Sequence, residues 1–296
     1  MYQAQAALFL YAVSPVHMGA GTAFGLIDSP IQRERHSDHP VFAGSGLKGA
    51  IRHHFAQKDF WRKDGLLERL FGPEDGELYA GAVSFGDAQL VLFPVRSAKQ
   101  GYVYVTSPLA LARCARQLAL LGKPVWQERV ASPNAGSCRV AGADFLTDGR
   151  LHLEAFDYAA TEDKALQGVG SWLAQHALPQ DEAHAFFRDK VERHLALLPD
   201  EDFSYFVKNA TVVEPHVRID DESGAASDRG LFYVENLPPE SLLIAPLLTS
   251  RERSGKKEVE AEAVLENVAT ELAGKTLQIG GDATVGRGQV IVTVLK

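Results

Sequence analysis

A glycine-rich segment with two cations could bind a phosphate group near residue 44. Residues 44–49 read Gly-Ser-Gly-Leu-Lys-Gly, and Arg52 follows Lys48 by one helical turn. Glycine exposes the backbone N–H groups at the start of a helix, where the helix dipole favours an anion. The alternative is a tight turn into a helix with a solvated basic face. The candidate contacts to a polyanion are Gly44, Ser45, Gly46, Lys48 and Arg52.

A second glycine-rich segment, residues 280–288, lies before the last predicted strand. It contains more glycine than a hairpin turn needs, although a flexible hairpin is the alternative interpretation. Gly280, Gly281 and Arg287 are therefore further candidate contacts. Two separate loops that combine glycine with a cation are what a protein that follows a phosphodiester backbone would use.

The spacing Gly-x-Gly-x-x-Gly at residues 44–49 also matches the dinucleotide-binding fingerprint. That fingerprint needs a hydrophobic strand directly before it, and residues 31–40 are too polar for a central strand. A nucleotide-dependent oxidoreductase is therefore a much less favoured alternative.

Asp28 is the candidate reactive carboxylate. It lies in a long irregular segment, residues 17–46, which has enough apolar residues to be an ordered loop. Ser29 and Pro30 follow Asp28, so its side chain is held in a turn. There it could act as a metal ligand or general base, or it could cap its own backbone in an Asx turn.

These residues must be positioned by the strands and helices around them. The order of the expected strands and helices predicts an α+β fold with one mostly antiparallel sheet and a ferredoxin-like core. No linker divides residues 1–296, so we expect a single domain. Expected strands cover residues 6–13, 83–93, 102–106, 151–156, 203–207, 212–219, 231–234, 242–248, 276–279 and 289–295. Expected helices cover residues 45–58, 66–71, 108–121, 162–176, 180–197 and 258–272.

Charge is distributed unevenly along the 296 residues, whose formal net charge is −8. Residues 1–63 contain seven Lys and Arg against four Asp and Glu, a net of +3, so the remainder carries −11. The acidic total argues against a polyanionic partner, but the basic N-terminal part contains most of the candidate contacts. No apolar run is long enough to span a membrane, and no basic segment precedes the first apolar run, so we expect a cytoplasmic protein without a membrane partner.

Three segments have distinctive motifs, which read Ser-Pro-Val-His-Met-Gly-Ala-Gly from Ser14, Gly-Leu-Ile-Asp-Ser-Pro-Ile-Gln-Arg-Glu from Gly25, and Pro-Val-Phe-Ala-Gly-Ser-Gly-Leu-Lys-Gly-Ala-Ile-Arg from Pro40. These motifs resemble the RAMP superfamily of CRISPR proteins. The sequence is most similar to the target-RNA-cleaving backbone subunits of type III-B (Cmr) effector complexes. The glycine-rich segment near the C-terminus and the motif Leu-Phe-Tyr-Val-Glu-Asn-Leu-Pro from Leu231 extend the resemblance over nearly the whole chain. Residues 95–200 carry the least of it.

This resemblance implies a ferredoxin-like (RRM-like) RAMP palm with inserted helices and a protruding β-hairpin thumb, for which residues 214–239 are the candidate. Copies would stack as a filament along a crRNA guide, together with other effector subunits, and each thumb would displace a base pair of the guide–target duplex. The resemblance places the catalytic aspartate at Asp28, with His17 and Glu235 around it. Guide contacts would fall on Lys48, Arg52 and the second glycine-rich segment.

The implied activity is endonucleolytic cleavage of target RNA in antiviral defence. The 2′-OH of the RNA would supply the nucleophile, so the protein needs to supply positioning, a carboxylate and a divalent cation such as Mg²⁺. Asp28 could hold that cation or polarise the 2′-OH. The alternative within the family is a structural RAMP subunit that does not cleave.

Overall fold

The central strand of the structure, β1 (Ala4–Ala12), is buried along most of its length. It pairs antiparallel with β12 (Leu242–Thr249) on one side and with β14 (Gln289–Leu295) on the other. β12 pairs in turn with β3 (Val83–Phe85) and β4 (Ala88–Arg96), again antiparallel. The computed structural model describes residues 2–22, 25–74, 79–256 and 258–296.

These strands have a ferredoxin-like topology. Along the chain, β1 is followed by α1 (Gly44–Ala56) and then by β3 and β4; further on, β12 is followed by α8 (Ala261–Leu272) and β14. In the sheet, the spatial order is β14, β1 and β12, with β3 and β4 beside β12. This is a βαββαβ arrangement with an antiparallel sheet, so the predicted ferredoxin-like palm is confirmed.

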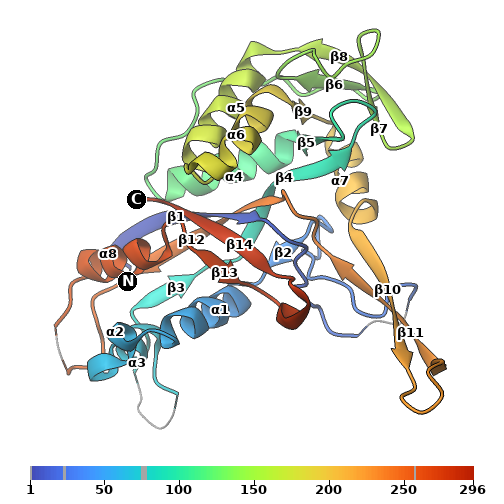
Figure 1. The fold of residues 1–296 in the computed structure, drawn as a ribbon. Helices are drawn as coiled ribbons and strands as arrows, with labels where there is room; N and C mark the ends of the chain where they lie inside the picture. The colour runs from blue at the N-terminus through green and yellow to red at the C-terminus, as the bar shows by residue number, and fades with distance from the viewer. Residues whose placement is uncertain (1, 23–24, 75–78, 257) are drawn as a thin grey trace.

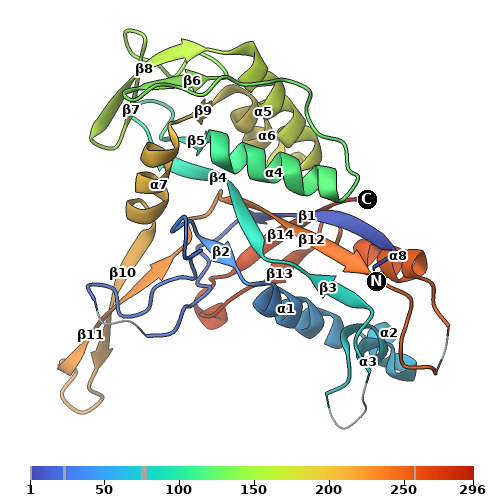
Figure 2. The same cartoon turned by 180° about the vertical axis from the view of Figure 1, so that it is seen from behind.

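Helices cover both faces of the palm sheet (Figures 1 and 2). α1 and α8 pack on one face, where Leu47 and Ile51 of α1 belong to the same core as Val264 of α8. On the opposite face, Phe9 of β1 shares a core with α4 (Pro108–Leu120), α5 (Lys164–His176) and α6 (Ala185–Arg193). Because both faces are covered, β1 is a continuous apolar run and not an alternating one.

The chain from β5 (Tyr102–Thr106) to β9 (Leu195–Leu197) forms an inserted lobe that extends the sheet (Figure 1). β5 pairs with β4 and leads into this lobe. The further strands, in spatial order, are β9, β6 (Ser137–Val140), β8 (Phe156–Glu162) and β7 (Arg150–Leu153). The β5–β9 and β6–β8 pairs are parallel, and the other strand pairs of the sheet are antiparallel.

Residues 203–207, expected as a strand, lie in α7 (Asp200–Asn209), so that prediction is wrong. Three acidic residues occupy the first turn after Pro199, where the helix dipole favours negative charge. Phe203, Phe206 and Val207 are buried on one face of this helix at a spacing of three and four residues. Over a short window, these aromatic and β-branched residues resemble a buried strand.

Two further boundaries differ from the predictions. The helix expected over residues 180–197 ends at Arg193, and the residues after it form the buried strand β9. The strand expected over residues 151–156 is divided into β7 and β8 by a turn in which Glu154 has a φ of 50°. Short elements complete the palm, namely β2 (Val41–Phe42), α2 (Asp59–Arg62), α3 (Leu66–Phe71) and β13 (Thr276–Gln278).

A two-stranded hairpin, β10 (Val212–Ile219) and β11 (Ala226–Asn236), forms a sheet of its own. It follows α7 and projects away from the palm (Figures 1 and 2). Within the described ranges, no helix has the length and apolar character that a membrane crossing requires.

Candidate functional site

The outer edge of β11 holds the loop that contains Asp28. Tyr233 pairs with Pro215, which has no N–H to donate, and Tyr233 directs its own backbone groups away from β10. Its N–H donates to Oδ2 of Asp28 at 2.7 Å, and its carbonyl accepts from the N–H of Ser29 at 3.1 Å. Asp28 is therefore fixed by a strand 205 residues away. Asp28 therefore does not form the Asx turn that the sequence left open, because its carboxylate binds the hairpin and not its own backbone.

His17 is anchored to the same strand edge. Its Nδ1 lies 2.7 Å from the carbonyl oxygen of Glu235. Because a carbonyl can only accept, Nδ1 carries the hydrogen, and in the neutral ring Nε2 has the free lone pair. Tyr233 and Glu235 are two residues apart, so the anchors of Asp28 and His17 lie about 7 Å apart along β11. The structure thus brings the predicted residues His17 and Asp28 together.

Asp28 keeps one carboxylate oxygen available. Its side chain is exposed, and among the described residues Oδ1 accepts no hydrogen bond. Asp28 thus has a free oxygen in a fixed orientation, with the imidazole of His17 nearby. Such an arrangement suits proton transfer or the binding of a cation.

Glu235, the third predicted catalytic residue, has a different environment. It is 2% exposed, and its Oε2 accepts from the N–H of Ile31 at 3.0 Å. Its Oε1 accepts from Arg33 at 2.6 Å and from the hydroxyl of Thr211 at 2.8 Å. Both oxygens are used by the protein, so the geometry makes Glu235 a positioning residue that ties the Asp28 loop to the hairpin base. Sequence reasoning did not assign Arg33 or Thr211 to this cluster.

A second buried ion pair fixes the same loop to the inserted lobe. Arg113 of α4 donates to both carboxylate oxygens of Glu34. Burial opposes the negative charge of Glu34, but the hydrogen bonds from Arg113 and Ser37 outweigh it and hold the pKa of this carboxyl below its usual value. The expected ordered loop is therefore present, and charged side chains anchor it on two sides.

The two glycine-rich segments pack against the segment that contains His17. A Cβ at Gly280, whose φ is 81°, would lie 2.3 Å from the carbonyl oxygen of His17. The N–H of Gly281 donates to that same oxygen at 2.9 Å. A Cβ at Gly46 would lie 2.8 Å from Cε of Met18. These glycines allow close backbone approach, and Ser45, Gly46, Gly280 and Gly281 remain on the surface.

The first helix turn and its cations are largely engaged by the protein itself. The N–H of Gly44 donates to Oδ1 of Asp87 at 2.8 Å, so a carboxylate occupies the anion position at the start of α1. Lys48 donates to the carbonyl of Val83 at 3.3 Å, and burial, with a smaller effect of Arg52, lowers its pKa. This environment, after a strand of only two residues, disagrees with a dinucleotide site.

Arg52 and Arg287 were expected as cations that face a polyanion, and both are bound within the chain. Arg52 donates to the carbonyl of Gly72 at 2.8 Å and to Glu74 at 3.0 Å. Arg287 is 6% exposed and pairs with Glu214 of the hairpin. The guanidinium of Arg287, a candidate contact to a polyanion, is therefore engaged in an internal ion pair.

A divalent cation fits the site only if a single protein carboxylate holds it. In the described part of the chain, no three His, Cys, Asp or Glu side chains gather into a metal site. Mg²⁺ commonly keeps several waters and takes one or two carboxylates together with substrate phosphates. Asp28, through Oδ1, fits as the single protein ligand of such an ion.

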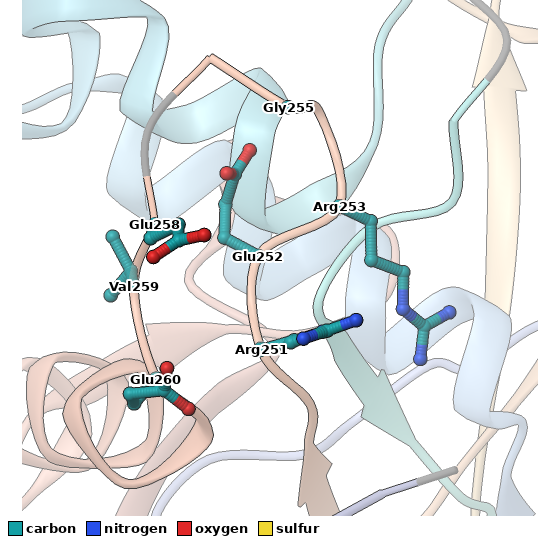
Figure 3. A pocket seen from close by; sticks show the side chains of 7 residues that line it. All are labelled: Arg251, Glu252, Arg253, Gly255, Glu258, Val259 and Glu260. Atoms are coloured by element: carbon teal, nitrogen blue, oxygen red, sulfur yellow. The ribbon is translucent and has the colours of Figure 1, made fainter.

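A pocket of about 480 Å³ lies at the opposite end of the palm, in the loop before α8 (Figure 3). Its walls include both signs of charge, and Oε1 of the lining residue Glu252 lies 3.4 Å from Nε of Arg69. The loop and the hairpin lie on opposite sides of the molecule (Figures 1 and 2). This pocket is therefore separate from the Asp28 site. The lining residues are Arg251, Glu252, Arg253, Gly255, Glu258, Val259 and Glu260.

A palm of ferredoxin-like topology, with a glycine-rich loop and a projecting hairpin, defines a class, and residues 9–291 match the RAMP superfamily. The chain belongs to this family. It is 35% identical over 290 residues to the CRISPR system Cmr endoribonuclease Cmr4 of Pyrococcus furiosus, covering 96% of this chain and 94% of that protein.

Solved structures agree with this family assignment. The crystal structure of oligomeric Cmr4 from Pyrococcus furiosus is 29% identical, with a TM-score of 0.76 over 99% of this chain and 98% of that one. A chain of the type III-B Cmr-beta complex bound to cognate target RNA has the same fold, with a TM-score of 0.74 over 99% of this chain and 98% of that one, at 20% identity.

Proposed function

We propose that this chain is the backbone subunit of a type III-B CRISPR ribonucleoprotein, where it binds the crRNA guide and cleaves complementary target RNA. The observation that carries the proposal is the exposed carboxylate of Asp28, held by the Tyr233 N–H at the base of a projecting hairpin. The similarity to a protein named Cmr endoribonuclease covers 96% of the chain and supports the same activity. The similar oligomeric Cmr4 supports assembly of several copies.

The chemistry assigned to the site is transfer within the RNA. The 2′-OH next to the scissile phosphate attacks the phosphorus, the bond to the 5′-oxygen breaks, and the products are a cyclic phosphate and a 5′-hydroxyl. Asp28 orients the attacking hydroxyl through Oδ1, Nε2 of His17 takes the proton of that hydroxyl, and the departing 5′-oxygen takes up a proton from water. In the alternative role of Asp28, its Oδ1 would instead hold a divalent cation, which would neutralise charge on the phosphate.

The hairpin presents an apolar face beside Asp28. Val217 pairs with Leu231, and Pro215 with Tyr233, so their side chains share one face of the ribbon. Val217, Leu231 and Tyr233 are all exposed. An exposed apolar ribbon suits contact with nucleobases that have left the duplex, because every base has an apolar face on which such side chains can pack. When a base pair of the duplex is displaced in this way, the RNA backbone beside it would become free for in-line attack at Asp28.

The proposal is tested by purifying the assembled complex and examining its RNA. We expect a small RNA with a repeated 5′ tag and cleavage of a complementary target at regular intervals. With Asp28→Ala, we expect the same RNA content and no cleavage. Cleavage at the normal rate would identify a structural subunit, with the activity in another chain. Tight NAD(P) binding by a chain that retains no RNA would contradict the proposal altogether.

A further inference from the structure

The hairpin is fastened to the palm differently through its two strands. β11 is held by backbone hydrogen bonds, because Leu237, directly after it, pairs with Val16, and Glu235 donates to the carbonyl of Ser29 at 3.0 Å. In the part of the chain that the structure describes, the hydrogen bonds and ion pairs that join β10 to the palm are those of Arg287. Apart from its pairing with β11, β10 is therefore joined to the palm by the polar contacts of a single side chain.

The guanidinium of Arg287 joins three parts of the chain. Its Nη1 donates to Oδ1 of Asn236, at the end of β11, at 3.0 Å, and lies 3.4 Å from Oδ2 of Asp282 in its own loop. Its Nη2 donates to Glu214 on β10 and lies 3.3 Å from Nε2 of His216. The side chain is 8% exposed, so these partners, and not solvent, satisfy its donors.

Arg287 lies in a loop whose backbone is held in place by hydrogen bonding and close packing. It lies between Gly286 and Gly288, which have φ angles of 83° and 80°. The N–H of Gly288 donates to the carbonyl of Pro15 at 2.8 Å, and a Cβ at this position would lie 2.3 Å from the carbonyl oxygen of Ile279. The loop that contains Arg287 is thereby bound to the segment that contains His17. The same contacts therefore also support the candidate active site.

We propose that Arg287 is a positioning residue that sets the direction in which the hairpin leaves the palm, and so the place of the hairpin tip relative to the palm. The eight residues of β10 span about 26 Å, so a rotation of about 5° at the base moves the tip by about 2 Å. In the proposed function the hairpin positions the target strand, so a shifted hairpin would misplace the scissile phosphate, and a displacement of about 1 Å at a reacting centre can reduce a rate about 100-fold. The orientation itself is a property of the free chain, whereas its effect on cleavage rests on the proposed function.

The experiment compares Arg287→Gln, Glu214→Gln and the double variant, with Arg218→Gln on the same strand as the control. Spin labels on Asp221→Cys at the hairpin tip and Lys275→Cys on the palm report the distribution of distances between them. Burial raises the pKa of both natural thiols, Cys114 and Cys138, so labelling is directed to the new cysteines.

Each single variant should broaden the distance distribution, and the double variant should broaden it no further, because both substitutions break one interaction. In the assembled complex, we expect cleavage to fall about 10-fold or more in each variant, with guide retention within about twofold of the wild type. The Arg218 control should change neither quantity. Thermal unfolding of each variant checks that the palm remains folded.

Two results would overturn the inference. One is an unchanged distance distribution in both single variants. The other is a loss of guide retention in Arg287→Gln but not in Glu214→Gln, which would mean that Arg287 contacts the RNA directly. A distribution that broadens as expected, in a chain whose wild-type complex does not cleave RNA, would support the positioning role and contradict the proposed function instead.

Discussion

Two groups of polar residues, both indicated by the sequence, have opposite environments in the structure. At the edge of β11, Asp28 and His17 each use one side-chain atom for anchoring and, among the described residues, have another that accepts no hydrogen bond. In the glycine-rich segments, Lys48, Arg52 and Arg287 bind carbonyl or carboxylate oxygens of the same chain.

The difference separates reactive groups from supporting ones. A polar side chain whose donors are satisfied by the protein stabilises or orients, since a new partner would have to displace the old one. A side chain that is anchored at one atom and open at another is oriented in advance for a reaction. The exposed backbone of Ser45, Gly46, Gly280 and Gly281 is what the glycine-rich segments leave for a phosphate backbone.

Among the variants outside Asp28, the largest expected effect is that of His17→Ala on cleavage. Removal of the imidazole takes away the Nε2 atom that would exchange a proton, so the single-turnover rate should fall by about 10²- to 10³-fold. His36→Ala, at an exposed position of the same loop, is the matched control and should leave the rate unchanged. A normal rate in the His17 variant would remove the imidazole from the reactive group.

Glu235→Gln tests the supporting role at the hairpin base. The substitution keeps the shape of the side chain but leaves Arg33 as a buried cation without its carboxylate, so the free energy of unfolding should fall by about 3 kcal/mol. Urea unfolding of the isolated chain measures this change, with Glu222→Gln at the hairpin tip as the control. A change below about 0.5 kcal/mol would mean that the ion pair does not hold the hairpin base.

Glu240 extends the comparison to a carboxylate without a cation. Burial raises its pKa to about 7. The folded state therefore keeps a proton that the unfolded chain releases at lower pH, so stability should decrease as the pH rises through about 5 to 7. Between about pH 5 and pH 8, the unfolding free energy of Glu240→Gln should therefore fall by about 2 kcal/mol less than that of the wild type. An identical pH dependence in the two chains would contradict the assigned environment.

Lys48→Gln should have the smallest effect. Because Lys48 already donates to the carbonyl of Val83, guide affinity should fall only about threefold, and the difference should shrink as salt is added. Filter binding at several salt concentrations measures both quantities. A loss much greater than about tenfold at low salt would mean that this cation contacts the RNA phosphates directly, and would remove the distinction between the two groups.

The parts of the fold that depend on local pattern were predictable from the sequence. The apolar run of β1, the four-residue spacing of Leu47, Ile51 and Phe55, and the strand before the C-terminus all appear where the pattern placed them. The error at α7 arose because the same aromatic residues suit a buried helix face and a buried strand. The resemblance led to Asp28, His17 and Glu235.

What the sequence could not provide was the pairing of distant polar groups. Tyr233 and Asp28, Arg33 and Glu235, and Arg287 and Glu214 are all brought together by the hairpin base, across 73 to 205 residues of chain. No local pattern shows whether a cation points to solvent or meets a carboxylate from another element. Arg287 was a candidate contact to RNA because of its glycine-rich segment, and its internal ion pair with Glu214 was not foreseen.

The central claim is that the carboxylate at the edge of β11 carries the reaction. Its most direct test is the single-turnover rate of target cleavage by a reconstituted complex with Asp28→Asn, with Asp59→Asn as a surface control and guide RNA quantified in each preparation. We predict a rate at least about 100-fold below the wild type for Asp28→Asn, a normal rate for the control, and equal guide content in all three preparations. Cleavage by the Asp28 variant at the wild-type rate would contradict the account.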